Sequence, residues 1–178
     1  MAVLKYAYDR REYMVKIDVK MKAEYIYDLL LFHTYSKFSG FMINVLGLAI
    51  IIIGGLSLGM GKMNMFQSVV CIMAGIGFIA YTPFNLKLKA KQLMKLDRYS
   101  NDISYEFSEN GIAENASGNI INYEWSRVEK AIATPKDIAF YVGNDEALIL
   151  PKEDFKENFM PVMKMIVQNV KRDKIYIR

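Results

Sequence analysis

The sequence predicts an α+β membrane protein, in which a two-helix transmembrane hairpin accompanies a small antiparallel sheet closed by a C-terminal helix. Two observations predict this fold. Between positions 38 and 86 the sequence contains one charged residue, Lys62, and from position 100 onward it breaks into short alternating segments. Because the 178 residues include 23 Lys and Arg and 19 Asp and Glu, a soluble segment as long as 38–86 would carry about a dozen charges.

The two apolar runs, 38–61 and 63–86, are each long enough to cross a bilayer as a helix. About 20 apolar residues span the roughly 30 Å hydrocarbon layer. The residues around Lys62 leave room only for a tight turn. We therefore predict a transmembrane hairpin over 38–86, with Pro83 bending the second helix near its end.

Basic residues at the ends of the runs predict the orientation of the hairpin. Lys37 precedes the first run, and four lysines and Arg98 follow the second, whereas the turn carries only Lys62. Cytoplasmic flanks are enriched in Lys and Arg. Both termini are therefore expected in the cytoplasm, in a two-pass protein of the cell (inner) membrane.

A basic juxtamembrane helix is expected over 87–99. Three lysines spaced four apart share one of its faces, with Arg98 close to them; the four residues are Lys87, Lys91, Lys95 and Arg98. This face could contact anionic lipid, at roughly 1 kcal/mol per basic residue. The alternative, which we favour, is that these charges only fix the topology.

Small residues predict a helix-packing face in the hairpin. Gly55 and Gly59 form a G-x-x-x-G pair in the first run, and Cys71 and Gly75 are small positions in the second. Small side chains let helix backbones approach closely. The face could mediate dimerisation, but we favour packing inside the hairpin. Neither run contains Asp, Glu, Lys or Arg, which argues against transport by the hairpin alone.

Residues 100–178 are expected to form a soluble domain of six short strands and a C-terminal helix. Strands are predicted from Ile103 to Phe107, on both sides of Ala116-Ser117-Gly118-Asn119 with the second including Ile121 to Trp125, from Val128 to Ile132, over Ile138–Val142 and over Ala147–Leu150, with Asn110-Gly111 as a strong hairpin turn. The helix is indicated by an apolar stripe at helical spacing, formed by Phe155, Phe159, Val162, Met163, Ile166 and Val170. Pro161 either kinks this helix or starts a second one.

Residues 1–37 precede the hairpin and contain two further elements. Val15–Met21 alternates apolar and polar side chains, which is typical of a strand. Ala23–Lys37 predicts a pre-membrane helix that leads into the first apolar run.

The order of these parts resembles the YcxB-like bacterial membrane proteins. The resemblance is carried by Tyr105–Ile112 (YEFSENGI), Trp125, Tyr141 and Ile149–Lys152 (ILPK). It implies a C-terminal domain similar to pleckstrin-homology-like bacterial domains, with a strongly bent sheet plugged by a helix. Such a barrel has seven strands. We hypothesise that Val15–Met21 supplies the seventh, so that the hairpin is inserted into one domain.

Composition and motifs exclude several classes of function. Tyr99–Arg178 carries ten basic and thirteen acidic residues, which does not fit a nucleic-acid-binding face. A single Cys and a single His exclude the usual zinc sites. Because no nucleophile or phosphate-loop motif is present, we expect no enzyme activity and no cofactor. Trp125 could belong to a docking surface, but a place in the core is favoured.

The function expected from the sequence is that of a membrane-anchored cytoplasmic binding or adaptor domain. Its partner would be another protein or a second copy of the chain, besides the lipid bilayer in which it is anchored. The alternative is a small accessory subunit that acts through its hairpin within a larger membrane complex, such as a transporter.

Overall fold

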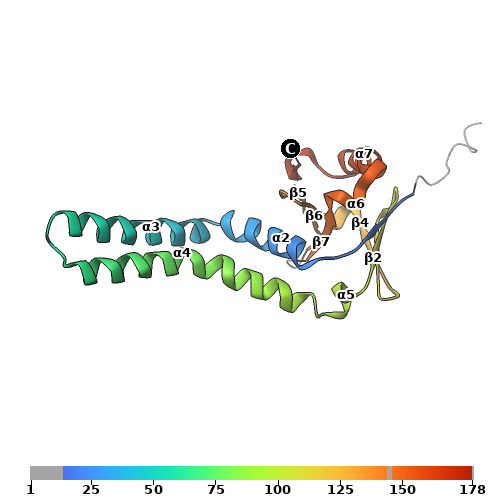
Figure 1. Ribbon diagram of the computed structural model, residues 1–178. Coiled ribbons are helices and arrows are strands. Elements are labelled where there is room, and N and C mark those ends of the chain that lie inside the picture. The colour runs from blue at the N-terminus through green and yellow to red at the C-terminus, as the bar shows by residue number, and fades with distance from the viewer. Residues whose placement is uncertain (1–13, 144–145, 178) are drawn as a thin grey trace, which may run out of the picture. The chain divides into compact units, whose positions relative to one another are not determined.

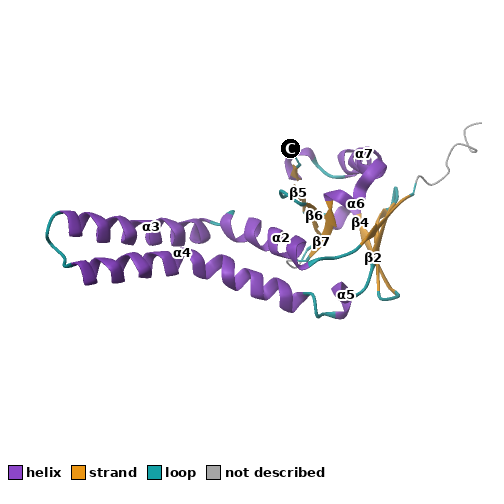
Figure 2. Ribbon diagram, in the orientation of Figure 1, coloured by secondary structure: helices purple, strands orange, loops and turns teal. Residues whose placement is uncertain are grey.

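The computed structural model describes residues 14–143 and 146–177, as an α+β arrangement of helices and short strands (Figures 1 and 2). Its main elements are, in chain order, β1 (Val15–Val19), α2 (Ala23–Tyr35), α3 (Phe38–Gly59), α4 (Met65–Leu93), α5 (Asp97–Ser100), β2 (Ile103–Phe107), β3 (Gly111–Ala116), β4 (Asn119–Glu124), β5 (Lys130–Ala133), β6 (Asp137–Tyr141), β7 (Ala147–Pro151), α6 (Lys152–Phe155), α7 (Phe159–Asn169) and β8 (Ile175–Tyr176).

The chain forms two compact units. One consists of the described parts of Met1–Tyr25 and Leu93–Arg178, and the other of Ile26–Gln92. We call the first unit the domain and the second the helical insert. The insert therefore interrupts the domain sequence between β1 and β2.

The first sheet of the domain joins residues from both sides of the insert. Its strand order is β1-β2-β3-β4, and every neighbouring pair is antiparallel. The register places Val15 opposite Phe107 and Val19 opposite Ile103. The hypothesis that the strand before the hairpin pairs with the C-terminal segment is confirmed. The buried faces of β1 and β2 alternate as the sequence pattern predicted.

The second sheet has the order β7-β6-β5-β8. β5, β6 and β7 form an antiparallel meander, and the short β8 runs parallel to β5. The sequence predicted one bent sheet of six to seven strands, and the described strands are instead divided between two sheets of four. β8 was not predicted, because a two-residue strand has no periodicity to detect.

Two hairpin turns of the first sheet require particular backbone conformations. Gly111 has a φ of 153°, and a Cβ there would lie 2.1 Å from the carbonyl oxygen of Tyr123. Ser117 and Gly118 have φ values of 53° and 81°, the left-handed pair that suits a two-residue hairpin loop. These turns fix the register of β3 against its two neighbours.

The core of the domain includes aromatic contacts between the sheets. The ring of Phe107 on β2 lies 5.8 Å from that of Phe140 on β6 and 6.4 Å from that of Trp125. Trp125 is buried, as favoured from the sequence, although it lies just after β4 in a 3-10 turn (Trp125–Arg127) and not on the strand. Its indole N–H donates to the carbonyl oxygen of Ser108 over 2.9 Å.

The C-terminal helix α7 buries one face and exposes another. Val162, Met165 and Ile166 are buried, whereas Phe159 and Met163 of the predicted stripe lie at its edge. Pro161 occupies the first turn of α7, so it starts the helix and does not kink it. A proline is tolerated there because the first N–H groups of a helix have no intrahelical partner.

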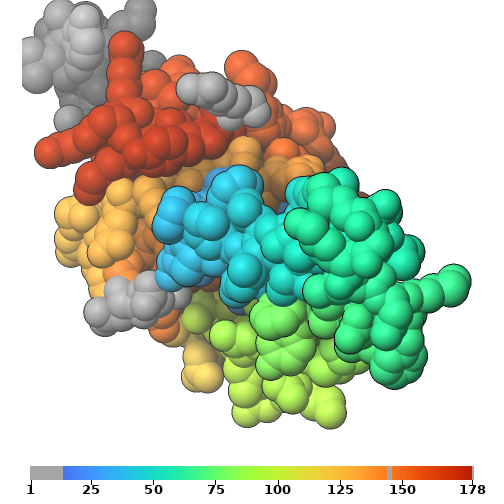
Figure 3. Space-filling model, turned by 90° about the vertical axis from the view of Figure 1, so that its left-hand side faces the viewer, coloured from blue at the N-terminus to red at the C-terminus, as the bar shows by residue number. Residues whose placement is uncertain are grey.

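The helical insert contains two helices long and apolar enough to cross a membrane, α3 and α4. They run side by side in opposite directions (Figure 1), and Figure 3 shows the turn between them with the side chains of both helices in contact. α4 continues through Pro83 to Leu93. The bounds of α3 and α4 differ from those of the two predicted apolar runs mainly because α4 extends beyond residue 86.

Glycines at three positions allow α3 and α4 to pack closely. A Cβ on Gly75 would lie 2.6 Å from both the carbonyl oxygen of Gly47 and Cγ1 of Ile51, and one on Gly54 would lie 3.0 Å from Cβ of Cys71. Backbones this close are possible only with small side chains. The interface within the hairpin is therefore made by Gly47 and Gly54 on α3 against Cys71 and Gly75 on α4.

The predicted packing face is thus divided between two surfaces. Cys71 and Gly75 lie inside the hairpin, in agreement with the favoured interpretation. Gly55 and Gly59 have no atom within 4 Å of an added Cβ, and both are exposed. The G-x-x-x-G pair does not contribute to packing between α3 and α4, because the neighbouring Gly54 occupies the inward position.

We predict that Gly75→Val destabilises the hairpin and that Gly55→Val does not. The Gly75 side chain would overlap the α3 backbone, and overpacking of this kind costs about 1–3 kcal/mol. Thermal unfolding of the full-length protein in detergent, followed by circular dichroism, measures both variants. The matched Gly55→Val control removes the same backbone freedom in open space. Equal losses in the two variants would contradict the packing described above.

Candidate functional site

The candidate site consists of two polar attachments inside the domain, which hold the two segments of the domain that flank the helical insert in sequence. One lies after α4, where α5 contacts β3. The other lies before and at the start of α2. Polar side chains of the domain form both attachments, and all of them belong to residues 22–25 or 98–153. We call them the Arg98–Glu114 pair and the Lys22 cluster.

The Arg98–Glu114 pair joins α5 to the inner face of β3 through two hydrogen bonds. Nε of Arg98 donates to Oε1 of Glu114 over 2.7 Å, and Nη2 donates to Oε2 over 2.6 Å. The Glu114 side chain is 1% exposed and that of Arg98 is 26% exposed. This two-point geometry matches a planar guanidinium to a carboxylate and fixes its orientation.

Neighbouring groups complete the attachment of α5. The hydroxyl of Tyr123 donates to Oε2 of Glu114 over 3.4 Å. Ser117, in the turn between β3 and β4, donates to the carbonyl oxygen of Asp97 over 2.9 Å, and Asn101 donates to the Ser117 hydroxyl over 2.8 Å. α5 is therefore held at its first and second residues and again just after its end.

Burial makes this pair sensitive to the loss of either partner. A carboxylate removed from water is costly unless it is paired and hydrogen-bonded. Partial burial disfavours the Arg98 charge, but the hydrogen bonds to Glu114 and the electrostatic interactions with Glu114 and its neighbours together outweigh this effect, and the pKa of the guanidinium is raised. The burial of Tyr105 and Tyr123 likewise raises the pKa of each phenol, and the negative charge of Glu114 adds to this effect.

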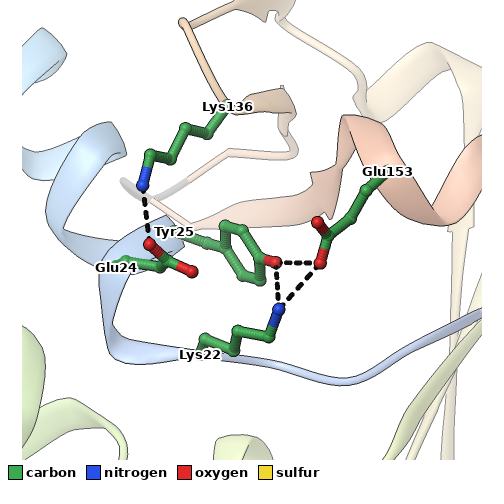
Figure 4. Close-up of polar contacts among 5 residues, drawn as sticks. All are labelled: Lys22, Glu24, Tyr25, Lys136 and Glu153. Carbon is green, nitrogen blue, oxygen red and sulfur yellow. Dashed lines mark hydrogen bonds and ion pairs between the residues drawn. The ribbon is translucent and has the colours of Figure 1, made fainter.

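The Lys22 cluster holds the start of α2 against α6 and the turn between β5 and β6 (Figure 4). Nζ of Lys22 donates to Oε1 of Glu153 over 2.8 Å and to the hydroxyl oxygen of Tyr25 over 2.9 Å. The Tyr25 hydroxyl in turn donates to the same carboxylate oxygen. Nζ of Lys136 donates to Oε2 of Glu24 over 2.6 Å. Two ion pairs thus flank one buried tyrosine ring.

The chemistry of the Lys22 cluster is that of an exposed network around a buried ring. Hydrogen bonds to Glu153 and Tyr25 raise the pKa of Lys22, and hydrogen bonds from Lys22 and Tyr25 lower the pKa of Glu153. Because the charged groups are solvated, each pair contributes little stability by itself. Tyr25 is 3% exposed, so its ring supplies packing while its hydroxyl fixes the orientation.

The four basic residues that were predicted to share one helix face do not lie together on one helix. Lys87 and Lys91 lie exposed on α4, Lys95 lies exposed in the turn after α4, and Arg98 lies on α5. The expected single helix over 87–99 is wrong, because α4 ends at Leu93. Since the Arg98 guanidinium is bound to Glu114, lipid contact stays a prediction for the three lysines.

Sequence reasoning missed most residues of the two attachments. One signal was present: Glu114 alternates with Ile112 and Ala116, which are inward-facing and buried. A carboxylate at a buried strand position implies a buried partner. No comparable signal identifies Tyr25, Glu153 or Lys136, whose contacts join segments far apart in the sequence.

Among the residues that the structure describes, no group of three or more His, Cys, Asp and Glu side chains is placed to hold a metal ion. Most of the groups whose pKa is clearly shifted belong to the two attachments, where other side chains of the domain bind them. Groups with a perturbed pKa often mark a catalytic site. Here burial of the tyrosines and pairing of the charged groups inside the domain account for the shifts.

Comparison with known proteins identifies a family for part of the chain. Residues 107–160 match the family of YcxB-like proteins, which confirms the resemblance predicted from the sequence. The match begins at the end of β2 and ends at the start of α7. No curated protein and no solved structure matches the chain.

We predict that Glu114→Gln destabilises the domain by about 2–3 kcal/mol. Loss of one partner of a buried ion pair costs about 3–5 kcal/mol, and the partial exposure of Arg98 reduces this value. Urea unfolding followed by fluorescence of Trp125, the sole tryptophan, reports on the domain alone. Asp18→Asn, which breaks the exposed pair with Lys16, is the control and should change stability by under about 0.5 kcal/mol. Equal effects would refute a special role for Glu114.

Proposed function

We propose that this YcxB-like chain is a membrane-anchored adaptor, in which the helical insert lies in the cell membrane and the domain binds a protein partner in the cytoplasm. The observation that carries the proposal is that one domain is built from segments on both sides of the insert, with β1 paired to β2. A flexible linker at one end of a domain would suffice to keep it near a membrane. A domain whose sequence is interrupted by its anchor suits a protein in which anchor and domain act together.

Exposed apolar surface supports the anchorage. Large side chains such as Leu46, Phe66 and Tyr81 are 53%, 77% and 66% exposed along α3 and α4. Soluble proteins rarely leave such a continuous apolar surface in water. Three lysines lie in the last part of α4 and Lys95 follows it, whereas the turn between α3 and α4 carries only Lys62, so both termini are assigned to the cytoplasm. Recovery of the chain in the soluble fraction of cells would contradict this anchorage.

An exposed apolar face on α7 supports a binding role for the domain. Met160 is 71% exposed and Val167 is 49% exposed, and Met163 and Lys164 lie between them on the same helix. Exposed apolar side chains, methionine among them, are typical of protein-binding surfaces. We assign no catalytic chemistry and no cofactor to the domain. Its pleckstrin-homology-like character, implied by the family resemblance, is part of this proposal.

The second candidate function is that of an accessory subunit of a larger membrane complex. The outward position of Gly55 and Gly59 favours it, because small exposed side chains allow another helix to approach. In this case the hairpin, and not the domain, would carry the partner contact. The lysines in the last part of α4 and Lys95 would serve topology or contact anionic lipid in either case.

Replacement of the hairpin distinguishes the two functions. Residues 38–86 are exchanged for an unrelated two-helix hairpin of equal length, and partners are identified by crosslinking in cells and mass spectrometry. The adaptor proposal predicts that a partner of the native chain is retained by the chimera and lost from a Met160→Glu/Val167→Glu chain. Urea unfolding followed by Trp125 fluorescence checks that both variants fold. If the partner is instead lost from the chimera and retained by the α7 variant, the accessory-subunit function is supported.

A further inference from the structure

The four outer strands of the two sheets differ in how their open edges are protected. An edge strand presents unpaired backbone groups, which charged side chains, proline or short length usually protect from pairing with another chain. β1 places the charged Lys16 and Asp18 outward, and β8 has two residues. β7 is largely buried and ends at Pro151. Among the described strands, these three edges each carry at least one protective feature.

β4 carries a charge only at its last residue, Glu124. Five of its six residues are exposed, and no charged residue, proline or glycine occurs from Asn119 to Tyr123. Ile120 is 65% exposed and Ile121 is 47% exposed. Because consecutive residues of a strand point to opposite faces, both faces of this edge are apolar. An open edge of this kind, with its only charge at the last residue, is suited to pairing with another strand.

We propose that β4 is a self-association surface, at which the β4 strands of two copies pair antiparallel around Ile121. Pairing of this kind would join the first sheets of the two copies across a two-fold axis. Such an interface is self-complementary, since each copy contributes the same residues. The inference concerns a different surface from the α7 face and does not depend on the adaptor proposal.

The sequence of β4 selects this register. Residues directly opposite one another in an antiparallel pair lie on the same face. With Ile121 opposite Ile121 of the second copy, Ile120 faces Asn122 and Asn119 faces Tyr123, so no charged residue is paired. Centring on Asn122 would set Ile120 against Glu124. Centring on Ile120 would leave Asn122 and Tyr123 without opposite residues.

The absence of charge before the last residue of the strand also favours a second copy as the occupant. A foreign acidic or basic segment would find no complementary charge between Asn119 and Tyr123. A hollow of about 160 Å³ lies beside Ile121, and its other lining residues are Asp97, Arg98, Glu114, Ala116, Ser117 and Asn119, with the Arg98 and Glu114 side chains bound to one another. In the proposed register it offers space for the second copy's Ile121 side chain.

Disulfide formation between copies tests the register. Full-length protein carrying Cys71→Ala and Ile121→Cys is oxidised at low concentration in detergent and resolved on a non-reducing gel. Opposite residues have Cβ atoms about 4.5–5.5 Å apart, close enough for a disulfide after small movements. We expect at least about tenfold more covalent dimer than from Asn115→Cys, which is exposed on the neighbouring β3. Equal yields would overturn the proposal.

A charge substitution tests the association independently. Ile121→Lys sets two like charges opposite one another, which is destabilising, and should convert a dimer to a monomer in light scattering. Ile121→Val, which keeps the apolar contact, should remain dimeric. Trp125 fluorescence in urea confirms that both variants fold. A native chain that is monomeric under all these conditions, or that crosslinks through position 121 only to a different protein, would overturn the proposal.

Discussion

The pairing of β1 with β2 is the constraint on which the domain depends. The two strands lie on opposite sides of the helical insert in sequence, yet their five residue pairs form one antiparallel ladder. Val15, Ile17 and Val19 are buried only because this ladder forms. The domain can therefore be completed only after the entire insert has been synthesised. Closing so long a loop has an entropic cost that grows slowly with length, so a well-packed strand can offset it.

The two attachments stabilise the segments of the domain that flank the insert by different physical means. The Arg98–Glu114 pair is a buried, two-point ion pair, which is specific in geometry and costly to break. The Lys22 cluster is solvated and relies on the buried ring of Tyr25 for packing. Displacement of α5 from β3 would therefore expose or unpair Glu114. Displacement of residues 22–25 from α6 would mainly remove the apolar contacts of Tyr25.

Local signals in the sequence predicted most elements but not how the strands are divided. Asn110-Gly111 located a turn, alternation located β1 and β2, and low charge located α3 and α4. The sequence predicted Trp125 on a strand because the alternation of apolar and polar residues continues one residue past the end of β4. The assignment of Gly54 rather than Gly55 to the α3–α4 interface depends on rotation of the helix, which spacing alone does not fix. The partner of Glu114 depends on the path of α5, for which a four-residue helix offers no pattern.

A designed disulfide between β1 and β2 tests the inserted-domain architecture most directly. Asp18 lies opposite Ser104 in the ladder, so a Cys71→Ala chain with Asp18→Cys and Ser104→Cys should form an intramolecular disulfide on mild oxidation. The same chain with cysteines at Asp18 and Glu106, which are two residues out of register, should react much more slowly. Rapid reaction of the matched pair alone would support the architecture. Absence of the bond, or equal rates for the two pairs, would contradict it.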